Sequence, residues 1–504
     1  PRMASGKPID APKDWRGITK HLGPGLIVTA CIVGSGELIA TPKVGADHGF
    51  SLLWFIVIGC VIKVFVQVEL GRAAVAHGKT TLQLMNEMPG PRLVVSWLVW
   101  CWLFMYIGVF FQLSGIVGGV GQVFAELNII SGEGSGFITP DKILAIGVSV
   151  ATALILASGR YKTVERFSVY MVLVFTLTTV YALFMLQTSD AMESYRITGA
   201  QVMEGLQFRL PDDFSTAFAA FGIIGVGATE LIYYPYWCLE KGYSKNVGTM
   251  DGDSSSQYDC PRCGAKKSFL GTIYTAGIAW MRKASLAPKC SDCGNILGNA
   301  ELRPGSWYLR AQGWLYVMRI DAWVSMVIYT SATVAFYLLG AALLREGGLS
   351  DKGMIVDLSK MFKPLGQAGL SVFLAGAFVV LFSTLVSATA SNARLLVDGM
   401  CLYKIKTVDT EEERLRLVRI CCIIIPMLCA GLYMIVGAPV SMVLMGGVAQ
   451  AMMLPFLAAA ALYFRYRKTD QPLRPGNAWT IMLWISALAM AAVGIYQLIT
   501  KITG

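Results

Sequence analysis

The chain is organised around residues 23–46, GPGLIVTACIVGSGELIATPKVGA, an apolar run interrupted at positions 34–37 by Gly-Ser-Gly-Glu. Each glycine weakens a helix by about 1 kcal/mol relative to alanine. A carboxylate at the centre of a bilayer costs at least ~2.5 kcal/mol. We therefore expect a broken membrane helix, in which Glu37 and freed carbonyl groups at Val33 and Gly34 face a watery cavity.

A second interrupted run, FGIIGVGATELIYYPYW, occupies residues 221–237 and carries Gly-Ala-Thr-Glu at 227–230. Glu37 and Glu230 thus lie in similar settings, roughly 190 residues apart. Interrupted hydrophobic segments at matching places in two halves of a chain indicate a transporter's binding site. The alternative is close helix packing through small residues, with each glutamate paired to a neighbouring cation.

The composition indicates an integral membrane protein. Of 504 residues, 55% are hydrophobic and only 15% are charged, whereas soluble domains carry about 25% charge. The net charge of +10 arises from loops between apolar runs, so the expected partner is the lipid bilayer and not nucleic acid. No secretory signal is expected, because the first apolar span carries the interrupted motif itself.

Eleven apolar runs approach the ~20 residues needed to cross a bilayer. They are 24–46, 50–71, 94–122, 142–159, 164–187, 214–238, 317–344, 368–392, 415–436, 440–464 and 478–499. The expected organisation is a cytoplasmic N-terminal tail (1–22), spans one to six (23–240), a cytoplasmic loop (241–313) and spans seven to eleven (314–504).

Lysine and arginine are concentrated in the N-terminal tail and in the even-numbered loops, with the loop 345–366 as an exception. This bias predicts a plasma-membrane protein with its N-terminus inside and its C-terminus outside. Spans one to five and six to ten then begin on opposite sides, and the first span of each set is interrupted. That pattern predicts an all-α inverted five-plus-five repeat with an eleventh span appended.

Two carboxylates at one cavity suit a divalent cation, because hard cations prefer oxygen ligands. The residues predicted to contact the transported ion are Glu37, Glu230, Gly34, Ser35, Gly227, Thr229 and Met453. The hydroxyl-rich eighth span offers a second-ion site, for example for sodium, at Ser383, Thr384 and Ser387. Alternatively, these hydroxyls bond back to their own helix.

The loop 241–313 contains two CxxC-Gly motifs separated by 26 residues. Their four cysteines, Cys260, Cys263, Cys290 and Cys293, have the spacing of a structural tetrahedral zinc site. Disulfides are not expected in a cytoplasmic loop. A small zinc-ribbon-like insert over about 250–304 is the prediction, with a redox dithiol pair or an insert without metal as the alternatives.

Residues 23–54, GPGLIVTACIVGSGELIATPKVGADHGFSLLW, resemble the opening of the Nramp (natural resistance-associated macrophage protein) divalent-metal transporters, and the eleven spans match that family. The resemblance covers nearly the whole chain except the cysteine-bearing insert. It implies the LeuT-type fold, with broken first and sixth helices and alternating access around a site at the bilayer midplane.

The first- and sixth-span motifs depart from the family pattern. Gly34 stands where the family has Asp, and Glu37 where it has Asn. The family's Met-Pro-His falls on residues 227–229, Gly-Ala-Thr, which are followed by Glu230. The soft thioether that helps the family prefer manganese and iron over calcium and magnesium is therefore missing, which implies a harder ion such as magnesium.

Two further positions differ from the family. Met453 stands where the family usually has a metal-contacting Gln, and the third-span acids tied to proton movement correspond to Gln112 and Gly115. The resemblance therefore supports metal transport but does not extend to proton coupling. It describes a divergent branch of the family.

The function expected from the sequence is transport of a divalent cation, Mg²⁺ or Mn²⁺, between Glu37 and Glu230. The alternative on the same fold is a sodium- or proton-coupled carrier of a small organic solute. A third possibility is a non-transporting sensor with the insert as its output. An enzyme is not expected, because the sequence offers no nucleophile–base set, nucleotide loop or open catalytic metal site.

Overall fold

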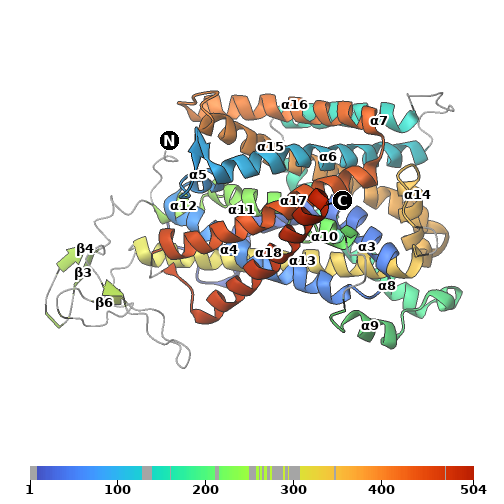
Figure 1. The fold of residues 1–504 in the computed structure, drawn as a ribbon, viewed down its shortest axis with the longest axis horizontal. Helices are drawn as coiled ribbons and strands as arrows, with labels where there is room; N and C mark the ends of the chain where they lie inside the picture. Colours follow the sequence, from blue (N-terminus) through green and yellow to red (C-terminus); the bar gives the residue numbers. More distant parts are fainter. Residues whose placement is uncertain are drawn as a thin grey trace.

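The structure is a computed structural model and consists of helices apart from three short hairpins (Figure 1). It describes residues 8–127, 139–158, 161–209, 215–248, 307–345, 348–470 and 473–503, with short pieces between 249 and 306. Only the backbone is described at residues 35, 161–169, 171, 215, 308 and 501–503, and in the strands between 257 and 289.

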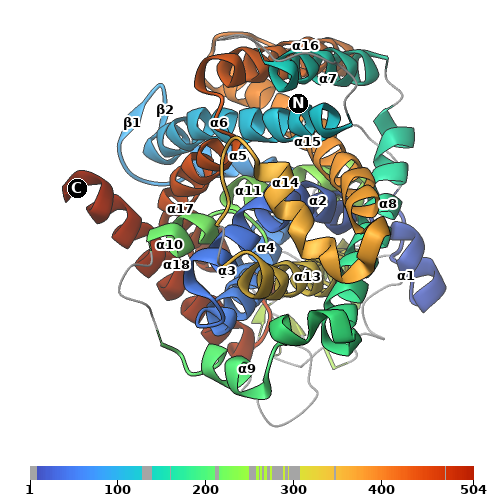
Figure 2. The same ribbon diagram turned by 90° about the vertical axis from the view of Figure 1, so that its right-hand side faces the viewer.

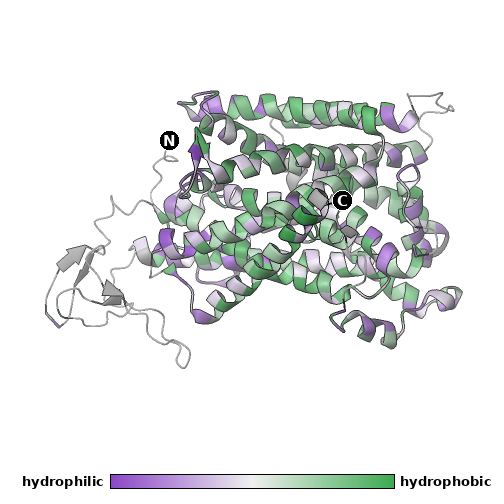
Figure 3. Ribbon diagram, viewed as in Figure 1, coloured by the Kyte–Doolittle hydropathy of each residue, from purple (hydrophilic) through white to green (hydrophobic). Residues whose placement is uncertain are grey.

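Long helices form the body of the molecule, and most run along its long axis (Figure 1). They are α4 (Leu53–His77), α6 (Trp97–Glu126), α7 (Pro140–Ala157), α8 (Tyr161–Thr188), α13 (Trp307–Leu343), α15 (Gly369–Leu402), α16 (Glu411–Val436), α17 (Pro439–Tyr463) and α18 (Asn477–Thr503). Apolar residues cover their middle parts, and polar residues gather toward the two ends of the body (Figure 3). This distribution is that of a bundle that crosses a bilayer.

Among the described residues, nine helical segments are long and apolar enough to cross a membrane. A tenth candidate is a pair, 172–188 and 190–205, bent by 100°. The predicted sixth span does not count as one helix, because it is divided into α10 (Ser215–Phe221) and α11 (Ala228–Glu240). Each of the eleven predicted spans overlaps with helix among the described residues, the sixth with two shorter helices.

The first span differs from its prediction. We expected unwound backbone near residue 34, but the chain continues from α2 (Pro24–Ile32) through a π-helix, η1 (Val33–Ala40), into α3 (Thr41–His48). A π-helix keeps backbone groups paired five residues apart, as Thr41 N with the Gly36 carbonyl. Such segments are frequent at functional sites. The two glycines are thus accommodated by widening the helix, not by breaking it.

The sixth span breaks as predicted. Residues 222–227 join α10 to α11 without regular helix, and Gly225 has a positive φ of 62°, a conformation in which glycine carries no steric penalty. Helix α11 begins at Ala228, after the extended Gly227. Glu230 therefore lies in the first turn of α11, where the helix dipole favours a negative charge.

The interrupted spans lie at the centre of the bundle, whereas α7 and α16 lie at its periphery (Figure 2). Helix α2 packs against α11, α13 and α15. Its N-terminus is capped by Asp321 of α13, whose carboxylate accepts from the Gly23 and Gly25 amides at 2.9 and 2.6 Å. The Tyr234 hydroxyl of α11 donates to the same carboxylate at 3.2 Å. One buried acid thereby fixes the start of the first span to spans six and seven.

Short elements connect the long helices. They are α1 (Trp15–His21), α5 (Thr81–Asn86), β1 (Arg92–Leu93), β2 (Val95–Ser96), η2 (Asp190–Tyr195), α9 (Gly199–Gly205), α12 (Tyr243–Val247), α14 (Met354–Ser359), η5 (Lys360–Ala368) and η6 (Phe464–Lys468). In the predicted insert, β3 (Gln257–Asp259) pairs with β4 (Lys266–Ser268), and β5 (Ile273–Tyr274) pairs with β6 (Pro288–Lys289), both antiparallel.

Candidate functional site

Glu37 ties the first span to the break in the sixth span. Its side chain is fully buried, and Oε1 accepts from the Gly225 amide at 2.9 Å and from the Thr333 hydroxyl of α13 at 2.7 Å. Oε2 accepts from the Thr41 hydroxyl at 2.9 Å. Gly36 permits this arrangement, because a Cβ at this position would lie 2.6 Å from the Ile223 carbonyl oxygen. Both oxygens of Glu37 are thus used to join three spans.

Lys63 of α4 holds the other side of the same break. Its side chain is fully buried, and its ammonium group donates to the carbonyls of Phe221 and Ile224, the latter at 2.7 Å. It also lies 4.1 Å from the centre of the Phe221 ring. Because a lysine at the centre of a membrane helix costs at least ~2.5 kcal/mol, these partners explain its tolerance. Glu37 and Glu230 both attract Lys63 electrostatically.

Lys63 is not among the site residues predicted from the sequence, although its position within an apolar span could have indicated it. FIVIGCVIKVFVQVE places one lysine in the middle of an apolar span, and an ionisable residue inside a membrane helix is by default a candidate functional residue. The alternative considered for the two motifs was a glutamate paired with a neighbouring cation. In the structure Glu37 instead accepts from an amide and two hydroxyl groups, and Lys63 donates to backbone carbonyls.

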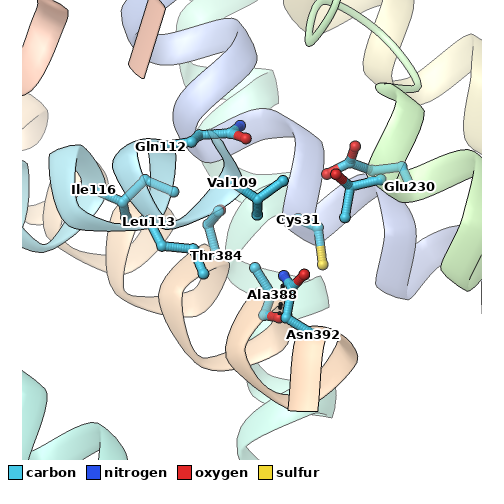
Figure 4. Close-up of a pocket in the computed structure, with 10 residues that line it drawn as sticks. Cys31, Val109, Gln112, Leu113, Ile116, Glu230, Thr384, Ala388 and Asn392 are labelled. Atoms are coloured by element: carbon cyan, nitrogen blue, oxygen red, sulfur yellow. Dashed lines mark hydrogen bonds between the residues drawn. The ribbon is translucent and has the colours of Figure 1, made fainter. Parts of the chain in front are cut away.

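Glu230 faces a cavity of about 10 Å³ at the centre of the bundle (Figure 4), which is room for a single water-sized atom. Spans one, three, six and eight all contribute to its wall. The lining residues are Cys31, Val109, Gln112, Leu113, Ile116, Thr229, Glu230, Thr384, Ala388 and Asn392. Figure 4 shows the Cys31 side chain between those of Glu230 and Asn392.

Three oxygens of this wall have no hydrogen-bond partner in the part of the chain that the structure describes. They are Glu230 Oε2, Thr229 Oγ1 and Asn392 Oδ1, on side chains that are between 2% and 8% exposed. The other Glu230 oxygen accepts from the Tyr233 hydroxyl at 3.1 Å. Because buried polar groups in native proteins are nearly always satisfied, these oxygens mark a position for a water molecule or a ligand, and the carboxylate among them favours a cation.

Gln450 of α17 positions two parts of the wall. Its Oε1 accepts from the Thr229 amide at 2.9 Å, and its Nε2 donates to Gln112 Oε1 at 2.5 Å. One amide therefore connects the tenth span to the start of α11 and to the third span. This contact orients Thr229 beside Glu230.

The structure brings together only part of the predicted ion-contacting set. Glu230 and Thr229 line the cavity, and Gly227 lies directly behind Glu230 Oε2, where a Cβ would collide with that oxygen. Glu37 and Met453 are buried but do not line it. Gly34 packs against Thr384 so closely that a Cβ would overlap its side chain. For Ser35 the structure describes only the backbone.

Two of the predicted second-ion residues, Ser383 and Thr384, donate hydrogen bonds to backbone carbonyls, and Thr384 also lines the cavity beside Glu230. Ser383 Oγ donates to the Val380 carbonyl of its own helix at 2.9 Å, which is the alternative that we considered for this span. Thr384 Oγ1 donates directly to the Ala30 carbonyl of α2 at 2.7 Å. Ser387 is buried, and its carbonyl accepts from Ser391. Helices α2 and α15 thus contact each other without an intervening ion at Thr384.

The predicted zinc site lies partly outside the described residues, because Cys260 and Cys290 are not described. Cys263 lies in a turn of the β3–β4 connection, and β6 ends directly before Cys290. In the described ranges no group of three or more metal-ligating side chains is found. The zinc site therefore stays a prediction.

Comparison with known families and structures places the chain among metal-transporter relatives. Residues 25–246 match the sequence profile of the family described as "Natural resistance-associated macrophage protein-like". The metal transporter Nramp6.2 of Populus trichocarpa is 28% identical over 164 residues, which is 32% of this chain and 28% of that protein. The divalent metal cation transporter MntH of Ralstonia nicotianae is 28% identical over 175 residues, covering 31% and 39%. The matches span less than half the length of these relatives.

The fold is shared over a greater length. The manganese transporter of Eremococcus coleocola superimposes with a TM-score of 0.64 at 14% identity, covering 98% of this chain and 90% of that one. Mhp1, a nucleobase-cation-symport-1 family transporter, gives a TM-score of 0.51 at 14% identity, covering 98% and 93%. These likenesses confirm the predicted transporter fold. Together with the helices long enough to cross a bilayer, they support an integral membrane protein whose residues 25–246 resemble the Nramp family.

Proposed function

We propose that the chain is a transporter that carries a divalent metal cation through the cavity beside Glu230, by alternating access. The observation that supports this most directly is Glu230 Oε2, a buried carboxylate oxygen without a partner among the described residues. Buried charges are normally paired or coordinate a metal. The cavity of about 10 Å³ suits a dehydrated ion and is too small for an organic solute.

The cavity wall also supplies a sulfur donor that the sequence analysis did not place at the site. Cys31 contributes a thiol from α2, beside the oxygens of Glu230, Thr229 and Asn392. Mg²⁺ takes oxygen ligands almost exclusively, whereas thiolate and thioether ligands favour softer transition metals. Of the two ions expected from the sequence, we therefore propose Mn²⁺ as the preferred cargo. Cys31 would provide the softness that the missing sixth-span thioether provides elsewhere in the family.

The experiment that tests this proposal is metal uptake by proteoliposomes containing the purified protein. Saturable Mn²⁺ uptake that Mg²⁺ and Ca²⁺ inhibit only weakly is the expected result. Because the third span has Gln112 and Gly115 at the positions of the family's acids, we expect little response to a pH gradient. Absence of metal uptake by well-folded protein would refute the proposal.

Replacing Cys31 with serine should change selectivity more than rate. The hydroxyl keeps the size of the thiol approximately but removes its softness, so the preference for Mn²⁺ over Mg²⁺ should fall about tenfold, or ~1.4 kcal/mol. The measurement is competition between the two ions in the uptake assay. Cys101→Ser is the matched control, since Cys101 is half-buried in α6 away from the cavity. Equal selectivity in the unsubstituted protein, Cys31→Ser and Cys101→Ser would show that Cys31 does not bind the ion.

We propose the cytoplasmic orientation of the N-terminus from the loop charges, and with it a zinc-binding insert in the cytoplasm. Purified protein should contain one zinc ion per chain, and Cys263→Ser with Cys293→Ser should remove it while Mn²⁺ uptake continues. Metal analysis of the purified protein checks this. A zinc content near zero in the unsubstituted protein would show that the four cysteines do not form a structural site.

A further inference from the structure

Lys63 occupies a position at which a broken membrane helix exposes carbonyl oxygens. Its two acceptors, Phe221 O and Ile224 O, belong to the C-terminal end of α10 and to the break that follows. Carbonyl groups at a helix C-terminus have no partner within the helix. In transporters with discontinuous helices, such carbonyls commonly coordinate a monovalent cation. Here the Lys63 ammonium group donates hydrogen bonds to these carbonyls instead.

Glu37 complements Lys63 on the opposite side of the break. It accepts from the Gly225 amide, one residue beyond the second carbonyl that Lys63 binds. The amide of the break is thus held by a carboxylate from span one, and its carbonyls are held by an ammonium from span two. Span seven joins this arrangement through Thr333. The charged groups that act on Lys63 are Glu37 of η1 and Glu230 of α11, with the Cys60 thiol on its own helix.

We propose that Lys63 is a built-in cation that replaces a dissociable monovalent ion at the break of the sixth span. The conformation of residues 221–225 then needs no sodium or potassium from solution. The direct contact of Thr384 with the Ala30 carbonyl agrees with this, because the eighth-span hydroxyls leave no ion between α2 and α15 at that point. Lys63 acts as a positioning residue, since it sets the geometry of the segment that leads into Glu230.

A lysine with a purely structural role and a lysine that stands in for an ion give different results when the side chain is shortened. Lys63→Ala leaves the carbonyls of Phe221 and Ile224 in place and opens the space that the outer side chain and its ammonium group occupied. Lys63→Met also removes the charge but fills the space. If Lys63 replaces an ion, the alanine variant should bind monovalent cations and the methionine variant should not.

The decisive measurement is thermal unfolding of the detergent-solubilised full chain, in N-methylglucamine buffer, with increasing Na⁺, K⁺ or methylammonium. Lys63→Ala should have a lowered apparent Tm that rises by several degrees as one of these cations approaches ~100 mM, as expected for ligand binding to the folded state. The unsubstituted protein, Lys63→Met and the control Lys43→Ala, whose lysine pairs with Asp47 near the surface, should not respond. A Lys63→Ala protein without a cation response, or an equal response in Lys63→Met, would overturn the proposal.

Two further experiments keep the proposal testable. One applies if Lys63→Ala does not fold, and the other measures transport. If Lys63→Ala cannot be purified even with methylammonium present, Lys63→Gln, which leaves a smaller space, should show the cation-dependent Tm, and a flat response there refutes the proposal. In proteoliposomes, replacing Na⁺ by N-methylglucamine should leave metal uptake by the unsubstituted protein unchanged, and a Na⁺ requirement would overturn the proposal. The thermal-unfolding experiment is informative even if the protein transports no metal. The proposal for Lys63 and the proposal of metal transport can therefore fail independently.

Discussion

Replacing Glu230 with glutamine is expected to reduce Mn²⁺ uptake by at least about 100-fold and, at the same time, to stabilise the folded protein. Substitutions of groups that merely orient metal ligands already cost 10–100-fold in affinity or activity, and Glu230 is proposed to contact the ion itself. The stability should rise because Glu230 Oε2 is buried without a partner among the described residues. Burying an unsatisfied polar group costs about 1–3 kcal/mol, and more when it is charged.

Glutamine has nearly the same shape as glutamate and retains an oxygen for the Tyr233 hydroxyl. The apparent Tm of Glu230→Gln in metal-free buffer should therefore exceed that of the unsubstituted protein by a few degrees. Glu204→Gln is the matched control, since Glu204 is exposed in α9 and should change neither quantity. Unchanged uptake by Glu230→Gln would place the transported ion elsewhere.

Replacing Glu37 with alanine should have the opposite effect on stability. The substitution leaves the Gly225 amide and the Thr333 hydroxyl without their acceptor. Each buried donor that is left unsatisfied costs about 1–3 kcal/mol. We therefore expect a sharply lower yield of folded protein and a strongly lowered apparent Tm, measured by thermal unfolding in detergent.

Glu37→Gln separates the positioning role from direct ion contact. Its side-chain oxygen can still accept from Gly225, so the protein should fold better than Glu37→Ala. Its affinity for Mn²⁺, measured by titration calorimetry, should fall less than that of Glu230→Gln. If instead Glu37→Gln folds normally and loses metal binding as completely as Glu230→Gln, the two glutamates form one ion site, as the sequence motifs suggested.

Substitutions of Glu37 and Glu230 are expected to change stability in opposite directions, because the two side chains have different roles. Glu37 has all its oxygens engaged and stabilises the junction of spans one, six and seven. Glu230 retains an open oxygen at the cavity. Proteins commonly keep such destabilising groups where function requires them. If both stability changes are observed, they would assign cargo binding to the sixth span and conformational support to the first.

Much of the fold could be predicted from the sequence. Apolar runs of sufficient length predicted eleven spans, and nine or ten helical segments of the described residues are long and apolar enough to cross a bilayer, which demands helices of a minimum length. Gly-Ala-Thr-Glu at 227–230 correctly marked a break in the sixth span, because glycines and a carboxylate oppose a continuous apolar helix. The same reasoning was wrong in detail for the first span, where a π-helix takes up residues 33–40. A local sequence cannot distinguish a widened helix from an unwound one, because neighbouring helices decide which is supported.

The sequence by itself determined that this is a helical membrane protein with a resemblance to the Nramp family, and it predicted a site near two acids in interrupted spans. Only the tertiary structure decided that Glu37 is engaged by Gly225, Thr333 and Thr41, and that Glu230 faces an open cavity with Cys31 and Asn392. It also revealed Lys63 at the break. The physical reason is that apolar runs and glycine positions are set by the bilayer and by local helix energetics. The partner of a buried charge, in contrast, is contributed by another helix, and no local pattern specifies which helix faces it.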